Sequence, residues 1–396
     1  MSNALKHVKY LAEEIGPRGS TSNEEKLAAE YVENNLRSLD NVDVFIQTFR
    51  GLSTWTWTVV MSMLFVLIAI VIYPIFPLLA ALLVVCGLFF YIMEVDNRPI
   101  LSRLMPKRES RNVISRIKTE SISSEKVVLV AHVDTSRADY SHHPKRVTSF
   151  RKLAVMNLML VVLVSIIYSL GALFDFVKIE IFPNNVEWLF TLLLAIPILF
   201  SCILIILREF FYDISPGAND NASGVGVVLE LMDYYSKNSL KNTEILAVFT
   251  GCEEAWCYGM IEFLNQYGKD LQEAYFINID NVGAGTPAFL QIEGMFFSHK
   301  ADPILLKLAR KLQKNHSELQ VEERSFRAGY QDGTVAMVKG YKAITFLALD
   351  QNNFPPNWHW ETDVVENIEE NVVRTTEEFV KLLITAIDQR SNTTTI

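Results

Sequence analysis

The sequence predicts an α/β fold, a mixed and mostly parallel sheet with helices on both faces, which carries four transmembrane helices as two hairpins inserted in its loops. Two observations predict this fold. Strand-like and helix-like segments alternate outside two long apolar blocks, which is the pattern of a parallel sheet covered by helices. The chain of 396 residues is also 50% hydrophobic, which is high for a protein with an entirely water-exposed surface.

The segments outside the apolar blocks begin with an amphipathic helix around Leu27, Tyr31 and Leu36. Ser22 precedes it and Glu25 follows three residues later, which is a capping-box start. The expected strands are 42–49, 112–117, 126–131, 243–249, 273–279 and 343–347, and the further helices are 224–235, 256–267, 304–313 and 368–387. In such sheets the functional site lies at the carboxyl ends of the strands.

The first apolar block contains no charged residue between Gly51 and Met93, which is enough for two spans of about 20 residues. The second block divides into the uncharged segments 153–174 and 188–207. Core helices of soluble proteins rarely run so long without a charge, so each block is interpreted as a membrane hairpin. The boundaries are 51–95 and 151–210 for the hairpins and 1–50, 96–150 and 211–396 for one soluble domain.

The flanking basic residues indicate the orientation of the hairpins. The tips hold only Lys178, so the soluble domain of this multi-pass membrane protein is expected to face the cytoplasm. No charged residue or histidine lies inside a span, which favours anchors over a transport pathway. The first twenty residues have no continuous apolar core and are not expected to be a secretory signal. A net charge of −9 argues against a nucleic-acid partner.

Metal-binding side chains follow several predicted strands. Two imidazoles and three carboxylates from separate elements can hold two zinc ions with one shared carboxylate, leaving positions open for water and substrate. The residues at these strand ends and at one helix start are His132, Asp134, Asp220, Glu253, Glu254 and Asp280, and His359 follows in a Pro- and Asn-rich loop just before the last helix.

Spacing suggests further roles for three of these residues. Residues two apart on a strand share a face, so Asp134 is expected to accept the second ring N–H of His132 and fix its tautomer. The adjacent pair Glu253 and Glu254 points in two directions, so that one carboxylate can bind metal while the other takes a proton from water.

The same residues lie in blocks that resemble the dizinc aminopeptidase family, which includes bacterial leucyl aminopeptidases, glutamate carboxypeptidases and transferrin-receptor-like proteins. The resemblance covers the chain outside the hairpins. It rests on Ala-His-Val-Asp-Thr, Gly-Ala-Asn-Asp-Asn-Ala-Ser-Gly, Glu-Glu-Ala-Trp-Cys-Tyr-Gly, Asn-Ile-Asp and His-Trp-Glu-Thr-Asp, which occur in the family's order.

The resemblance implies the zinc-exopeptidase fold, of the phosphorylase/hydrolase type, and two zinc ions as cofactors. Asp220 would bridge the ions, His132 and Asp280 would complete the ligands of one, and Glu254 and His359 those of the other. Glu253 would be the general base.

The implied function is that of a membrane-anchored, zinc-dependent exopeptidase, and an aminopeptidase is favoured. A carboxypeptidase or another amide hydrolase on the same site is an alternative, because the metal ligands do not discriminate between them. A catalytically silent receptor or scaffold is another, although the complete ligand set and Glu253 argue against it. The expected partners are a peptide substrate and the lipid bilayer. The oligomeric state and the substrate residue are left open.

Several neighbouring residues give weaker expectations. Trp256 and Met260 stand where family members more often have Gly and Ser, which puts the pocket shape in doubt, and Asp332 is expected near the site. His142 and His143 are interpreted as part of a solvated loop rather than a further metal site. Cys252 and Cys257 are expected to be buried small hydrophobes.

The hairpins also suggest where the site faces. If strands 42–49, 112–117 and 126–131 form an antiparallel meander, the first and third end at the same edge of the sheet. Each hairpin would then leave from that edge, and the active site would face the bilayer, where short peptides near the membrane surface could reach it.

Overall fold

The computed structural model describes residues 2–117, 125–177 and 186–390, so Lys178 lies outside the described residues. The chain forms two compact units. One contains the sheet and consists of Met1–Ser53, Lys107–Thr148 and Asp213–Ile396. The other contains the apolar helices and consists of Thr54–Pro106 and Ser149–Tyr212.

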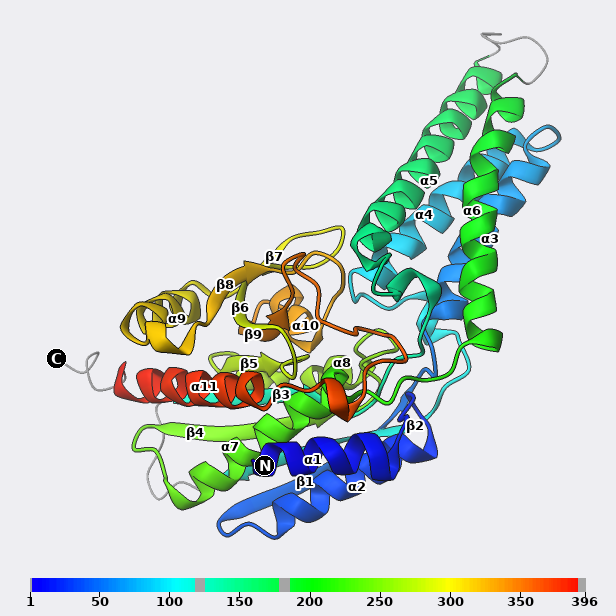
Figure 1. Ribbon diagram of the computed structural model, residues 1–396. Coiled ribbons are helices and arrows are strands. Elements are labelled where there is room, and N and C mark those ends of the chain that lie inside the picture. Colours follow the sequence, from blue (N-terminus) through cyan, green and yellow to red (C-terminus); the bar gives the residue numbers. More distant parts are fainter. Residues whose placement is uncertain (1, 118–124, 178–185, 391–396) are drawn as a thin grey trace. The chain divides into compact units, whose positions relative to one another are not determined.

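The first unit is built on a nine-stranded sheet with the order β1-β2-β4-β3-β5-β9-β6-β7, and β8 pairs with β6 (Figure 1). The central strands β4, β3, β5 and β9 are parallel, whereas β1, β2 and β7 run antiparallel to their neighbours, as β6 does to β9. The strands are β1 Val42–Gly51, β2 Arg108–Ile117, β3 Glu125–His132, β4 Thr243–Thr250, β5 Tyr275–Ile279, β6 Thr286–Glu293, β7 His299–Lys300, β8 Glu322–Ser325 and β9 Lys342–Leu349. The predicted mixed α/β sheet is confirmed.

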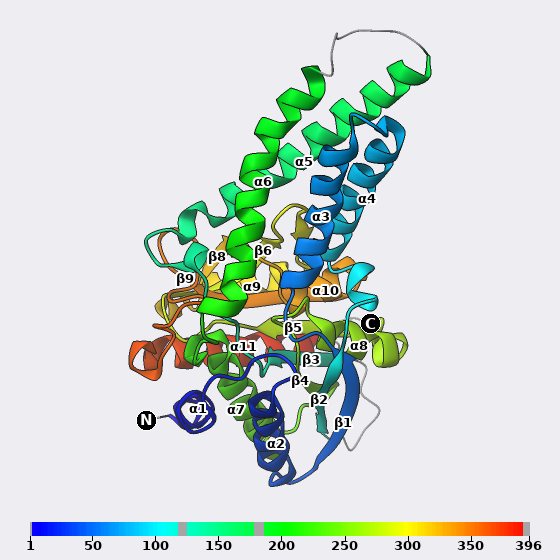
Figure 2. The same ribbon diagram turned by 90° about the vertical axis from the view of Figure 1, so that its right-hand side faces the viewer.

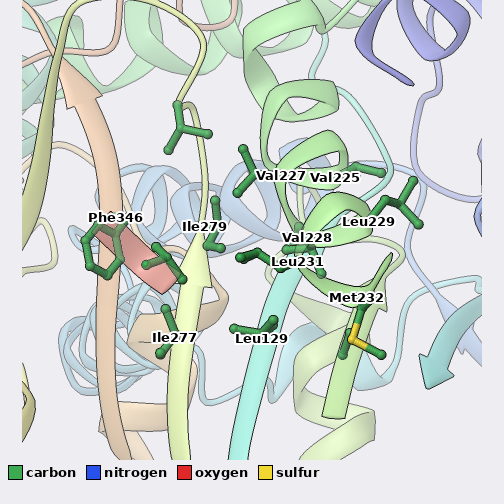
Figure 3. Packing of buried hydrophobic residues seen from close by; sticks show 14 of the residues in the cluster. Leu129, Val225, Val227, Val228, Leu229, Leu231, Met232, Ile277, Ile279 and Phe346 are labelled. Carbon is green, nitrogen blue, oxygen red and sulfur yellow. The ribbon is translucent and has the colours of Figure 1, made fainter. Parts of the chain in front are cut away.

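Helices cover both faces of this sheet because successive strand residues point to opposite sides. Leu129 and Ile277 belong to the buried cluster that also contains residues of α1, α2, α7, α9 and α11, and Figure 3 shows the part of it formed with α7. Val128 and Phe276 point the other way, toward α8 and α10. The helices are α1 Asn3–Lys9, α2 Asn23–Arg37, α7 Gly224–Lys237, α8 Tyr258–Tyr267, α9 Pro303–Asn315, α10 Asp332–Val338 and α11 Glu370–Arg390.

The predicted antiparallel meander is wrong, because β4 lies between β2 and β3. Strand β4 pairs antiparallel with β2 and parallel with β3 over the full length of β3, from Glu125 to His132. Since β1 is antiparallel to β2, strands β1, β4 and β3 still point the same way. Strands β1 and β3, which precede the hairpins in the sequence, therefore both end at the carboxyl edge of the sheet. That the active site faces the bilayer stays a prediction.

The second unit contains four apolar helices that lie side by side (Figure 2). They are α3 Thr56–Ile72, α4 Pro77–Val95, α5 Val147–Phe176 and α6 Val186–Phe211. Among the described residues, three of them, α4, α5 and α6, are long and apolar enough to cross a membrane, whereas α3 has 17 residues and is shorter. A fourth span stays a prediction.

Ring stacking and hydrogen bonds join the two hairpins near both ends of this helical unit. The Tyr73 and Tyr168 rings stack with centroids 3.9 Å apart, and Trp188 Nε1 donates to the Ile70 carbonyl at 2.7 Å. At the other end the hydroxyls of Thr54 and Thr56 donate to Glu209 Oε1 at 2.8 and 2.7 Å. The hairpins therefore pack as one bundle.

Candidate metal centre

Loops at the carboxyl edge of the sheet bring the five predicted ligands together. His132 ends β3, Glu254 follows β4 and Asp280 follows β5, and these three strands are parallel neighbours. Asp220 lies in the turn that leads into α7, and His359 lies in the loop between β9 and α11. The ligands form two groups of closely spaced donor atoms, His132 with Asp220 and Asp280, and Asp220 with Glu254 and His359.

Asp220 is the residue that the two groups share. Its Oδ1 lies 3.1 Å from His132 Nε2, and its Oδ2 lies 3.1 Å from His359 Nε2. Asp280 Oδ1 is 3.5 Å from His132 Nε2, and Glu254 Oε2 is 3.2 Å from His359 Nε2. Two donors of one tetrahedral zinc ion lie about 3.4 Å apart, since each is about 2.1 Å from the metal. Both groups therefore have the spacing of zinc ligands.

The electrostatics of the site also fit a cation. Burial lowers the pKa of His132, but the charges of Glu253 and Asp280 outweigh it and raise that pKa well above its usual value. For His359 the charge of Glu254 likewise outweighs burial and raises the pKa to about 10. Glu254 Oε1 is buried and accepts no hydrogen bond from the described residues. Because the surroundings favour positive charge at these imidazoles, a divalent ion would be stabilised in place of their protons.

Asp134 lies beside the ligands, but its carboxylate does not have the predicted partner. His132 Nδ1 is 3.0 Å from the backbone carbonyl of Asp134 and 3.6 Å from its nearer carboxylate oxygen, which is too long for a hydrogen bond. The carboxylate instead accepts the backbone N–H groups of Glu253 and Glu254 at 3.0 and 3.1 Å. The expectation failed because the turn after β3 directs the Asp134 carboxylate toward the loop after β4. The backbone carbonyl of Asp134 lies next to the His132 ring instead.

Glu253 is buried next to the first ligand group, with Oε2 4.0 Å from His132 Nε2. Burial raises its pKa well above the usual value. Asp332 and Cys257 lie close to it, so Asp332 is at the site as expected. Burial raises the pKa of Asp332 to about 7 and that of the Cys257 thiol well above its usual value. Cys252 is buried as well, so the expectation for both cysteines is confirmed.

Three further residues support the site and were missed from the sequence. Asp363 accepts the backbone N–H groups of Asn219 and Asp220 at 2.6 and 3.0 Å. Glu25 Oε1 accepts the Cys252 N–H at 2.8 Å. The Arg18 guanidinium donates to five backbone carbonyls, those of Leu11, Gly16, Val133, Pro216 and Gly217.

The sequence did contain signals for two of them. Asp363 closes the block that carries His359. Glu25 is the acidic residue of the predicted capping box, and its backbone N–H donates to Ser22 Oγ at 3.0 Å. Its carboxylate accepts the Thr21 N–H with one oxygen and the Cys252 N–H in the loop after β4 with the other, and not the Ser22 N–H. The interpretation of His142 as part of a solvated loop is wrong, because its side chain is 3% exposed and its Nδ1 lies 2.8 Å from Asp139 Oδ2.

Known proteins match this chain in sequence and in fold. Residues 208–384 match Peptidase family M28. A vacuolar membrane protease from Laccaria bicolor is 35% identical over 71 residues, which are 18% of this chain and 7% of that protein. The match thus spans a small part of that relative.

Solved structures share the fold at low sequence identity. A leucine aminopeptidase precursor from Bacteroides thetaiotaomicron has a TM-score of 0.56 at 17% identity, over 96% of this chain and 95% of that chain. A zinc aminopeptidase from Bacillus subtilis has a TM-score of 0.57 at 14% identity, over 97% and 94%. Porphyromonas gingivalis glutaminyl cyclase has a TM-score of 0.58 at 16% identity, over 97% of each. The predicted family resemblance and fold are confirmed.

Proposed function

We propose that this chain, whose residues 208–384 match Peptidase family M28, is a membrane-anchored aminopeptidase that removes N-terminal residues from peptides with two zinc ions. The observation that carries the proposal is the Asp220 carboxylate, whose two oxygens lie 3.1 Å from two different imidazoles. A ligand that bridges two metal ions needs one donor for each of them.

The side chains divide the work of hydrolysis between them. His132 and Asp280 would hold one ion, Glu254 and His359 the other, and Asp220 both. The bound ions would polarise the scissile carbonyl and make water a stronger nucleophile. Glu253 is not needed as a ligand, and it is buried beside the first group, so it is the base that takes the water proton and returns it to the departing amine.

Two further groups of observations support the anchored location and the reaction. The three long apolar helices support membrane insertion, with the sheet unit on the cytoplasmic side as the basic flanks indicate. The aminopeptidase neighbours support hydrolysis at a free N-terminus. Other structural neighbours are glutaminyl cyclases, so the experiment must exclude cyclisation of an N-terminal glutamine as the reaction.

The test uses the full-length chain purified in detergent and a panel of peptides that are N-free, N-blocked, C-amidated or begin with glutamine. We expect release of the N-terminal residue from every N-free peptide, C-amidated ones included, and loss of this activity with a chelator. Glu253→Gln should abolish turnover and keep its zinc, whereas Glu318→Gln, at an exposed position, should match the wild type.

Other outcomes would overturn the proposal in distinct ways. Cleavage of only the N-blocked peptides would identify a carboxypeptidase. Ammonia release from the glutamine peptides without hydrolysis would identify a cyclase. Zinc binding without turnover of any peptide would identify a receptor or scaffold.

A further inference from the structure

The segment just before α5 packs its rings against the loop that carries His359. The His142 ring lies with its centroid 4.7 Å from that of Trp358 and 4.8 Å from that of His359. The His143 ring lies 4.9 Å from that of Trp360. Two consecutive histidines thus contact all three rings of the Trp358-His359-Trp360 segment.

Asp139 fixes the ring of His142. Its Oδ2 lies 2.8 Å from His142 Nδ1, and its Oδ1 accepts the Ser141 backbone N–H at 2.6 Å. A carboxylate at Nδ1 favours the tautomer with the proton on that nitrogen, and this sets the orientation of the imidazole. Both side chains are largely buried, at 12% exposure for Asp139 and 3% for His142. The pair is therefore a rigid support and not a solvated loop.

His359 depends on such support more than the other imidazole does. His132 lies at the end of β3, and its Nδ1 donates a hydrogen bond to the backbone carbonyl of Asp134. His359 lies outside any helix or strand and has a φ of +51°, which is unfavourable for a side chain with a Cβ. Its Nε2 must nevertheless stay 3.1 Å from Asp220 and 3.2 Å from Glu254.

We infer that Asp139 and His142 are positioning residues for His359, and that the metal ion held by Glu254 and His359 requires them. The inference rests on the proposed function, because it assigns the Asp139–His142 pair to one of the two proposed zinc ions. It predicts that substitutions in the pair lower the affinity for one zinc ion. The affinity for the other ion, which His132 and Asp280 would hold, should stay unchanged.

The experiment compares the full-length wild type with His142→Ala, His142→Phe and Asp139→Asn, and uses His143→Ala as the matched control. Zinc affinity is measured by chelator competition, and the Co²⁺-loaded proteins are compared by visible absorption. We expect His142→Ala and Asp139→Asn to weaken one of two zinc sites about 10–100-fold and to change the cobalt bands of that site. His143→Ala should stay within about 2-fold of the wild type, because its neighbour is Trp360 rather than a ligand.

Two results separate this inference from the proposed function. Wild-type affinity and an unchanged cobalt spectrum in both His142→Ala and Asp139→Asn would overturn the inference while leaving the two-zinc site intact. A wild type that binds no zinc would overturn the proposed function itself. If His142→Ala does not fold, His142→Phe, which keeps an aromatic ring but not the bond to Asp139, and Asp139→Asn decide the matter on the same readouts.

Discussion

The Asp134 carboxylate accepts a hydrogen bond from the backbone N–H of Glu253 at 3.0 Å. This bond joins the turn after β3 to the loop after β4, next to the predicted ligands His132 and Glu254. The backbone position of Glu253 is therefore held by a residue in the turn after another strand.

Replacing Asp134 by Asn should slow turnover and leave the zinc content unchanged. The amide has one accepting oxygen, so it can serve only one of the two backbone N–H groups that the carboxylate holds. We expect kcat to fall about 10–100-fold, as for other residues that orient a metal site. Steady-state kinetics with metal analysis measures both quantities. Ser20→Ala removes one donor to Asp134 Oδ2 and should have a smaller effect. An unchanged kcat in Asp134→Asn would refute this role.

Replacing Asp363 by Asn should reduce zinc affinity about 10–100-fold, because Asp363 holds the backbone of Asn219 and Asp220. Excess zinc should then restore part of the activity. Asp302→Asn is the matched control, since Asp302 also accepts two backbone N–H groups, at the start of α9. It should leave zinc affinity unchanged, and chelator competition on both variants provides the comparison. Equal affinities in the two variants would contradict the prediction.

Replacing Arg18 by Met should destabilise the sheet unit. Burial lowers the pKa of Arg18 to about 10, so the group is still a cation at neutral pH, and it is bound by five carbonyl oxygens. The variant would leave these carbonyls without their donor, and we expect a loss of about 3–5 kcal/mol. Arg37→Met removes an exposed pair with Glu33 and should cost less than about 0.5 kcal/mol. Denaturant unfolding measures the loss of unfolding free energy in both variants. Equal losses in Arg18→Met and Arg37→Met would show that the Arg18 hydrogen bonds do not contribute to stability.

The buried Glu293 should make stability fall as the pH rises. Burial raises its pKa from 4.5 to about 7, so between these values the folded state holds a proton that the unfolded state has released. The resulting loss of unfolding free energy is absent below about pH 4.5 and complete above about pH 7, where it amounts to about 3 kcal/mol. Glu293→Gln cannot ionise, so its stability relative to the wild type should increase over this range. Unfolding free energies measured at several pH values would show parallel curves if the prediction is wrong.

The sequence predicted the features that depend on neighbouring residues. Uncharged apolar length indicated the four helices of the second unit, because the cost of placing charge in a bilayer does not depend on the fold. Alternation of apolar segments predicted most of the parallel sheet. The predicted ligands could be named because four of them are strand-end or helix-start residues, His359 lies in a loop, and all five stand in blocks that resemble a known family. Ser22 was correctly identified as the cap of α2, since capping is local.

Only the tertiary structure decided how these segments meet. Strand β6 was missed because Pro287 interrupts its pattern, and its pairing with β9 and β8 supplies the stability that its own sequence does not indicate. The position of β4 between β2 and β3 overrode the expected meander. Asp134 accepts the Glu253 N–H, and His142 is buried beside His359. In both cases the contacting residue lies more than 100 positions away in the sequence, so local patterns could not indicate it. Local patterns fix the types of residue and element, whereas partners distant in sequence are chosen by the packing of the whole fold.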